Sequence, residues 1–115
     1  MKSVPFSISD AHRGASEMRG TVCVEGDDVV IEMQVKFLSL FKRPPQTFRF
    51  DVTDLEEVRH RRGLWNDKVT LRTRPMEAVT RIPGAANGEL CLKVKRAHRP
   101  DVDRLLDHLE MWVTT

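Results

Sequence analysis

The sequence predicts a mainly β, α+β fold, in which six to seven antiparallel strands form a partly open barrel or sandwich capped by one C-terminal helix. Three observations support this class. Apolar and polar residues alternate along Val29–Phe37, as in a strand with one buried face. The apolar spacing changes to three and four residues over Val102–Trp112, as on one stripe of a helix. Turn signals at short, regular intervals favour hairpin connections between the strands.

The length of 115 residues predicts one domain covering 1–115. Residues 1–17 form its least defined part, and residues 100–113 form the closing helix. The formal net charge of +2 is close to neutral, so bulk charge does not indicate a nucleic-acid partner.

The N-terminal half contains the most regular strand pattern. Val4, Phe6 and Ile8 alternate with polar or small residues, which indicates a short first strand. A second strand begins at Gly20, and Gly26-Asp27-Asp28 predicts a tight turn into the long strand Val29–Phe37. Pro44 and Pro45 then place residues 38–46 in a loop or at a sheet edge, because proline cannot donate to a central ladder.

The second half predicts shorter strands separated by turn residues. Alternation and flanking breakers place them at Thr47–Val52, Leu55–Arg61, Lys68–Thr73, Ala78–Ile82 and Glu89–Lys95. The Ala78–Ile82 segment has the least regular alternation of the five.

The C-terminal helix has a clear apolar stripe. Pro100 suits a first helical turn, and Asp101 and Asp103 favour the positive end of the helix dipole. A helix this short is marginal alone in water, so its stripe must pack on the preceding strands. The stripe consists of Val102, Leu105, Leu106, Leu109 and Trp112.

The order of these elements resembles the pleckstrin-homology-like superfold, especially small bacterial PH-like and GRAM-like domains. The resemblance covers about residues 18–113 and is carried by the hairpin Gly20–Glu32, by the run Phe50–Val58 and by the closing strand with its helix. Lipid-binding members of that family hold phosphates with basic residues at the first hairpin. In this sequence, the turn that corresponds to that hairpin is acidic and contains Glu25, Asp27 and Asp28. Negative charge repels phosphate, so no phosphoinositide site is expected at this turn.

Basic residues gather in two later stretches. One covers residues 58–74, around the predicted strands Leu55–Arg61 and Lys68–Thr73, and the other comprises Lys93, Lys95, Arg96 and Arg99. If these faces meet, they would attract an anion or an acidic partner. The alternative is that they are solvated strand faces that prevent edge-to-edge pairing. The candidate anion- or partner-binding residues are Arg59, Arg61, Arg62, Lys93 and Arg96.

Aromatic side chains are scarce among these basic residues. Trp65 is the only one in the first stretch, and it fits the core as well as the surface. Domains that bind nucleic acid through a β-sheet stack bases on several exposed aromatic side chains. A specific nucleic-acid partner is therefore not expected here.

The sequence contains no recognisable catalytic or metal-binding motif. It lacks a nucleophile elbow, a P-loop and a dinucleotide fingerprint. The histidines lack metal-ligand spacing, and Cys23 and Cys91 form no C-x-x-C pair, so we expect two reduced thiols and neither metal nor cofactor. The four histidines are His12, His60, His98 and His108.

These observations favour a non-catalytic interaction or scaffold module that binds a protein partner or itself. The alternative is weak binding of an anion or an anionic membrane through the basic strand faces, and an enzyme of unrecognised type ranks third. Anionic lipid ranks below protein as the expected partner. The N-terminus shows no signal-peptide pattern, and no apolar run approaches the roughly 20 residues of a membrane span, so a cytoplasmic location is expected.

Overall fold

The computed structural model describes residues 3–8, 18–37, 41–42, 46–82 and 85–110, with the side chains of 34–37 and 41–42 left out. Within these ranges the fold is mainly β and ends in a helix, as predicted. The strands are β1 (Val4–Ile8), β2 (Met18–Glu25), β3 (Asp28–Phe37), β4 (Phe41–Lys42), β5 (Gln46–Asp51), β6 (Leu55–Arg61), β7 (Asn66–Thr73) and β8 (Glu89–Lys95). The helices are α1 (Glu77–Thr80) and α2 (Arg99–Glu110), with the 3-10 turns η1 (Val52–Asp54) and η2 (Arg96–His98).

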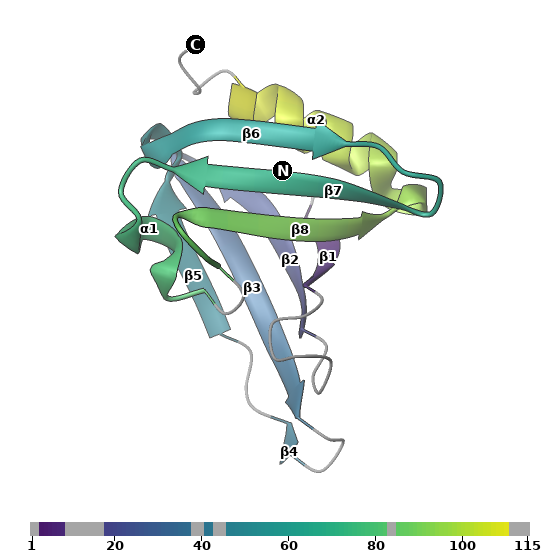
Figure 1. Cartoon of the computed structure of the whole chain (residues 1–115), viewed down its shortest axis with the longest axis horizontal. Coiled ribbons are helices and arrows are strands. Elements are labelled where there is room, and N and C mark those ends of the chain that lie inside the picture. The colour runs from purple at the N-terminus through teal and green to yellow at the C-terminus, as the bar shows by residue number, and fades with distance from the viewer. Residues whose placement is uncertain (1–2, 9–17, 38–40, 43–45, 83–84, 111–115) are drawn as a thin grey trace.

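The described strands form one open antiparallel sheet. Its order is β4-β3-β2-β1-β8-β7-β6, and β5 pairs with the first part of β3. In Figure 1, β6, β7 and β8 run across the direction of β2, β3 and β5, so the two halves of the sheet face each other. Buried side chains of both halves fill the space between them.

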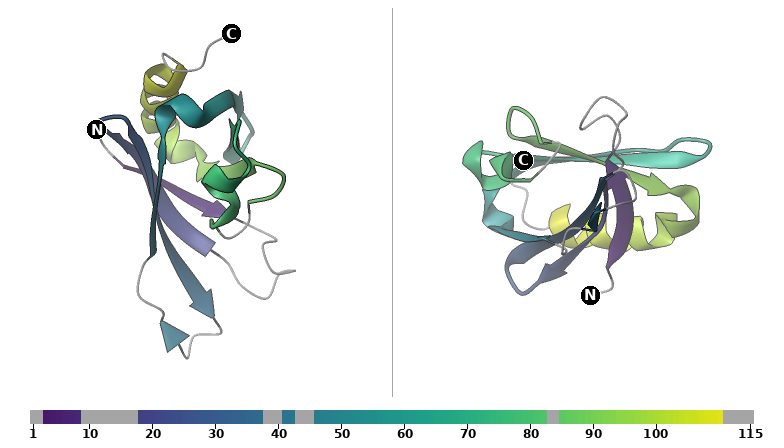
Figure 2. Two further views of the ribbon diagram at one scale, coloured as in Figure 1. Left: turned by 90° about the vertical axis from the view of Figure 1, so that its left-hand side faces the viewer. Right: turned by 90° about the horizontal axis from the view of Figure 1, so that it is seen from below.

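Helix α2 packs its apolar stripe on this core. Val102, Leu105, Leu106 and Leu109 are buried, as their spacing predicted. The helix contacts β1 and β2 in one half of the sheet and β6 and β8 in the other. Figures 1 and 2 show it lying along one end of the sheet. Residues 111–115, including Trp112 of the predicted stripe, lie outside the described residues.

The strand faces follow the predicted alternation. Val4, Phe6 and Ile8 of β1 are buried, and the same period recurs along β7 and β8. Cys23 is an exception: it lies between Val22 and Val24, whose alternation would turn it to the opposite face, yet it is buried together with Val30, its direct cross-strand partner. Cys23 and Cys91 are free thiols.

The predicted strand Ala78–Ile82 is wrong. Residues Glu77–Thr80 form the short helix α1, and the Thr80 hydroxyl donates to the Met76 carbonyl at 2.7 Å. Val79 and Ile82 are both buried, which is the three-residue spacing of a helical turn rather than the two-residue spacing of a strand. Since β7 and β8 pair directly from Asn66 opposite Lys95 to Arg72 opposite Glu89, the segment between them serves as their connection.

The turn at Gly26 forms as predicted but is not the first hairpin of the sheet. Gly26 has a φ of 59°, and Glu25 pairs with Asp28 across it. However, β1 pairs with β2 along Val4–Ile8, so β1 and β2 make the first hairpin and the acidic turn belongs to the second. The expectation that no phosphoinositide binds at the acidic turn stays a prediction.

Candidate anion-binding face

The outer face of β6, β7 and β8 brings basic residues from distant parts of the sequence into one row. Because side chains alternate along each strand, Lys68 and Lys93 point away from the core that Val69 and Leu92 enter. The strand register places Arg61 opposite Lys68, and Lys68 opposite Lys93. Lys95 lies opposite Asn66 in the next row, and η2 continues with Arg96. We call Arg61, Lys68, Lys93, Lys95 and Arg96 the cationic end.

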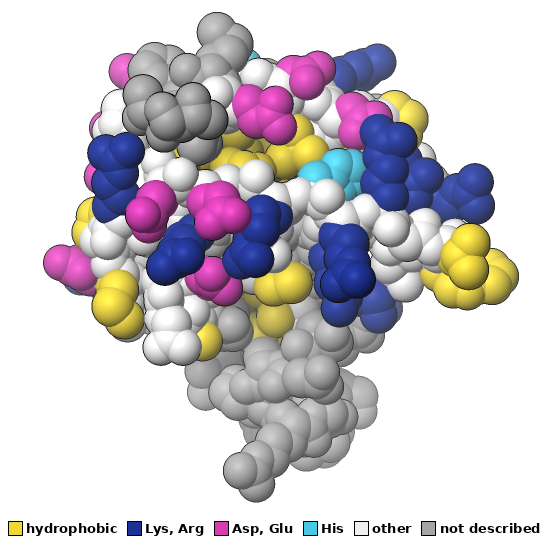
Figure 3. All heavy atoms as spheres, turned by 45° about the horizontal axis from the view of Figure 1, so that its top comes forward, with side chains coloured by type: hydrophobic (Ala, Val, Ile, Leu, Met, Phe, Trp, Pro, Cys, Tyr) yellow, Lys and Arg dark blue, Asp and Glu magenta, His cyan; other side chains and the backbone are white. Residues whose placement is uncertain are grey.

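The two ends of this face differ in charge balance. Away from the cationic end, Arg59 lies 3.3 Å from a Glu57 oxygen and 3.0 Å from a Glu89 oxygen, and Arg72 lies 3.6 Å from Glu56. Figure 3 shows Lys and Arg side chains among acidic ones on the left of this face and gathered with fewer acidic ones on the right. Among the described residues, no ion pair reaches any member of the cationic end.

Like charges that face each other directly across strands destabilise the pairing. The row Arg61, Lys68 and Lys93 contains two such pairs. At the other end the register places Arg72 between Glu57 and Glu89, so opposite charges face each other there, whereas this row keeps the repulsion between its cations. A bound anion would relieve it.

The structure divides the five candidate residues. Arg61, Lys93 and Arg96 belong to the cationic end, whereas Arg59 is paired with two glutamates and Arg62 lies 3.5 Å from Asp103 of α2. Lys68 and Lys95 were missed. Their strand periodicity already placed them outward, but only the pairing of β7 with both β6 and β8 puts them beside the others.

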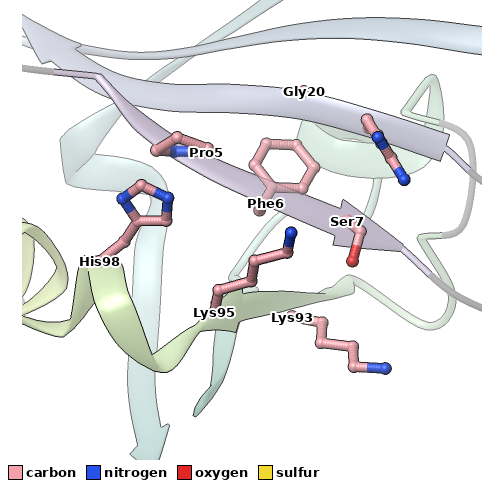
Figure 4. Close-up of a pocket in the computed structure, with 8 residues that line it drawn as sticks. Pro5, Phe6, Ser7, Gly20, Lys93, Lys95 and His98 are labelled. Carbon is pink, nitrogen blue, oxygen red and sulfur yellow. The ribbon is translucent and has the colours of Figure 1, made fainter. Parts of the chain in front are cut away.

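A hollow of about 210 Å³ lies at the seam between β1 and β8. These two strands pair at Ser7 and Lys93, and the hollow opens beside that pair. In Figure 4, Lys95 extends toward Phe6 and Ser7, and His98 lies near Pro5. This volume is below the roughly 300–1,000 Å³ of pockets for drug-sized ligands, so the hollow suits one small anionic group. Its lining is Pro5, Phe6, Ser7, Arg19, Gly20, Lys93, Lys95 and His98.

A buried carboxylate fixes the shape of the β6–β7 turn beside the cationic end. Asp67 has 0% exposure and accepts two hydrogen bonds from Arg99, at 2.9 Å from Nε and 2.6 Å from Nη2. It also lies 2.8 Å from Nε2 of His60 and accepts the Gly63 N–H at 3.3 Å. Arg99 donates in turn to the Gly63 carbonyl at 2.9 Å. We call this group of Asp67, Arg99, His60 and Gly63 the Asp67 latch, and it ties the first residue of α2 to the turn.

The latch keeps Asp67 ionised. The Arg99 hydrogen bonds hold the pKa of the Asp67 carboxyl far below its ordinary range, and the bonds from His60 and Gly63 act in the same direction. The same contact raises the pKa of Arg99. Sequence reasoning missed the latch because the predicted strand began at Lys68, whereas β7 begins at Asn66 and its alternation puts Asp67 on the inward face with Val69 and Leu71. A charged residue at an inward position requires a partner, and that signal was available.

The turn that the latch holds presents two large apolar side chains to solvent. Leu64 is 78% exposed and Trp65 is 81% exposed, so the surface alternative for Trp65 is the right one. The Trp65 carbonyl accepts the Arg96 N–H at 3.1 Å, which ties this turn to η2 as well. We call Leu64 and Trp65 the hairpin tip.

Metal ligands and paired titratable side chains can be compared directly in the same region. Among the described residues, no three His, Cys, Asp or Glu side chains are grouped so that they could hold a metal ion. His60 and Asp67 form a close pair, but Arg99 neutralises the carboxylate and occupies both of its oxygens. The pair therefore has the geometry of a structural contact.

No family model, curated protein or solved structure matches this chain. None of the described helices is long and apolar enough to cross a membrane.

Proposed function

We propose that this chain is a non-catalytic binding module whose cationic end holds a phosphate-bearing or similarly charged ligand. The observation that carries the proposal is the row Arg61, Lys68 and Lys93, in which directly opposed cations make no ion pair with a described residue. The seam hollow supports it, because Lys93 and Lys95 both line it and the Lys95 amine extends toward Ser7 (Figure 4).

We further propose that the fold is a PH-like, partly open barrel. The crossing of the two halves of the sheet supports this assignment, as does the helix packed along one end (Figures 1 and 2). The fold by itself does not specify a ligand, so the proposed function depends on the surface residues.

An anion accounts for this surface better than the other two functions. An enzyme would need reactive groups close to a substrate cavity, whereas the most strongly perturbed carboxyl here is committed to Arg99. A protein partner or self-association remains a prediction, and an acidic partner would use the same cations.

The test is a calorimetric titration of the protein with inositol hexakisphosphate, carried out at low and at physiological ionic strength. Binding should weaken with salt, because the Debye length falls to about 8 Å near physiological ionic strength. Lys68→Glu should abolish measurable binding, since it reverses the charge at the centre of the row.

Arg81→Glu is the matched control. Arg81 is exposed beside α1, at the opposite end of β7 from the cationic end, and its reversal changes the net charge equally. If both variants lose binding to the same extent, only total charge matters and the proposed site is wrong. If the unaltered protein binds at neither salt concentration, the proposed function itself fails.

A further inference from the structure

The hairpin tip and the cationic end lie together at one extremity of the β6–β8 face. The tip joins β6, which ends at Arg61, to β7, which begins at Asn66 opposite Lys95. Arg96 donates its N–H directly to the Trp65 carbonyl. Figure 3 shows hydrophobic side chains projecting at the same edge as the gathered Lys and Arg side chains.

Exposure of this kind has a cost in water. Leu64 and Trp65 are adjacent and more than three-quarters exposed, although large apolar side chains gain free energy when removed from water. Their arrangement does not result from a loose turn, because Asp67 and Arg99 hold the backbone at Gly63. The fold therefore keeps these two side chains outside the core by specific contacts.

The combination of an apolar tip and surrounding cations matches one kind of surface. Tryptophan favours the boundary between the headgroups and the acyl chains of a bilayer, where its ring is amphipathic. Lysine and arginine beside it are attracted to anionic headgroups, by about fivefold in affinity for each cation near the surface. A soluble anion would satisfy the cations but would leave the tip in water.

We propose that the β6–β7 turn docks on an anionic lipid bilayer, with Leu64 and Trp65 entering the interface and the cationic end contacting the headgroups. This inference rests on the proposed function, since it assigns the anion to lipid headgroups. The seam hollow is then positioned to hold one headgroup phosphate near Lys93 and Lys95. The Asp67 latch acts as a positioning group that presents the tip.

The experiment uses the full chain carrying Trp112→Phe, which leaves Trp65 as the only tryptophan of the two in the sequence. Vesicles of phosphatidylcholine alone are compared with vesicles that also contain phosphatidylserine. Co-sedimentation and the Trp65 emission spectrum are measured, and brominated lipids serve as quenchers inside the bilayer. We expect binding to the anionic vesicles only, together with a shift of emission to shorter wavelength and quenching by the brominated lipids.

Two variants separate the contributions. Leu64→Ala combined with Trp65→Ala should weaken vesicle binding at least about tenfold, because two large apolar side chains no longer leave water. It should leave the affinity for inositol hexakisphosphate unchanged. Lys68→Glu should weaken binding of both probes, and Met76→Ala is the matched control for the tip, since Met76 is exposed by 55% near α1.

The outcomes distinguish the two proposals. Binding of inositol hexakisphosphate without binding of anionic vesicles overturns the membrane inference and keeps the proposed function. Equal vesicle binding by the tip variant, or equal binding to neutral vesicles, also overturns the inference. If the Trp65 emission spectrum shifts when polyglutamate is added but not when vesicles are added, the ligand of the hairpin tip is an acidic protein segment and the membrane inference is overturned. Failure of both probes removes the proposed function and the inference together.

Discussion

At the scale of single residues, Asp67 connects three parts of the structure. It is a fully buried carboxylate whose partners come from the turn, from β6 and from the start of α2. A buried ion pair adds little to stability relative to apolar packing, but loss of one partner is costly. Its value here is positional, because it fixes where the hairpin tip points.

Replacement of Asp67 by alanine should lower the free energy of unfolding by about 3 kcal/mol. This is the lower end of the range for removing one partner of a buried ion pair, since the Arg99 side chain is 22% exposed and keeps some contact with water. Chemical denaturation monitored by circular dichroism measures the change. Asp107→Ala, the same substitution at an exposed position of α2, should have little effect, and an equal loss in both variants would contradict the role of the latch.

The latch also predicts a pH dependence. The pKa of Asp67 is lowered in the folded state, so the unfolded chain binds more protons in acid. The stabilising contribution is therefore complete above the unfolded pKa of about 3.9 and is lost as the pH falls below it. In denaturation from pH 7 to pH 2, the stability difference between the unaltered protein and Asp67→Asn should shrink toward the acid end. A difference independent of pH would mean that the charge of Asp67 contributes nothing.

Gly20 illustrates how a residue permits close strand packing. A Cβ atom at this position would lie 2.2 Å from the Glu32 carbonyl oxygen and 3.0 Å from the Phe6 ring. Gly20→Ala should therefore destabilise the fold by about 1–3 kcal/mol, the usual cost of overpacking. Thermal unfolding of both variants measures the effect. Thr21→Ala, at the next residue of β2, should lower the free energy of unfolding by about 1 kcal/mol or less. Equal stability of Gly20→Ala and the unaltered protein would show that β2 and β3 can shift apart easily.

At the scale of elements, α2 is the clearest case of a sequence pattern that becomes a packing interaction. Leu105 is 1% exposed and lies on the stripe that faces the core. Leu105→Ala should lower the free energy of unfolding by about 2–5 kcal/mol through lost burial and the remaining cavity. Arg104→Ala on the exposed side should change it by less than about 0.5 kcal/mol. Similar changes in the free energy of unfolding for the two variants would mean that the apolar stripe does not stabilise the contact between α2 and the core.

The β6–β7 hairpin is the element on which both proposals depend. Its outer face is neutralised by glutamates near Arg72 and carries only cations near Lys68. Its turn is held by hydrogen bonds from η2 and from α2. One end of the hairpin thus has paired charges, and at the other end we propose that the cations and the exposed apolar side chains contact a ligand.

At the scale of the whole molecule, α2 joins the two halves of the sheet. It contacts β1 and β2 on one side and β6 and β8 on the other. Deletion of residues 100–115 should therefore abolish the cooperative unfolding transition rather than lower its midpoint slightly. Thermal unfolding followed by circular dichroism tests this, and a truncated chain that melts like the full-length protein would show that the sheet is stable alone.

The sequence by itself determined the class of the fold and the faces of most elements. The alternation that buries Val29, Ile31 and Met33 and the stripe from Val102 to Leu109 report which side of an element is buried, because each period is a property of the local backbone. The tight turn at Gly26 follows from equally local chemistry.

Only the tertiary structure decided which residues share a surface. Periodicity placed Arg61, Lys68 and Lys93 outward, but their alignment in one row depends on strand register between segments distant in the chain. The Asp67 latch depends likewise on Arg99, 32 positions away in the sequence. The short helix α1 was missed because its few apolar residues fit a strand as well as a helical turn. The direct pairing of β7 with β8 leaves no place for a strand between them. The candidate site is thus a product of strand pairing, which no local pattern encodes.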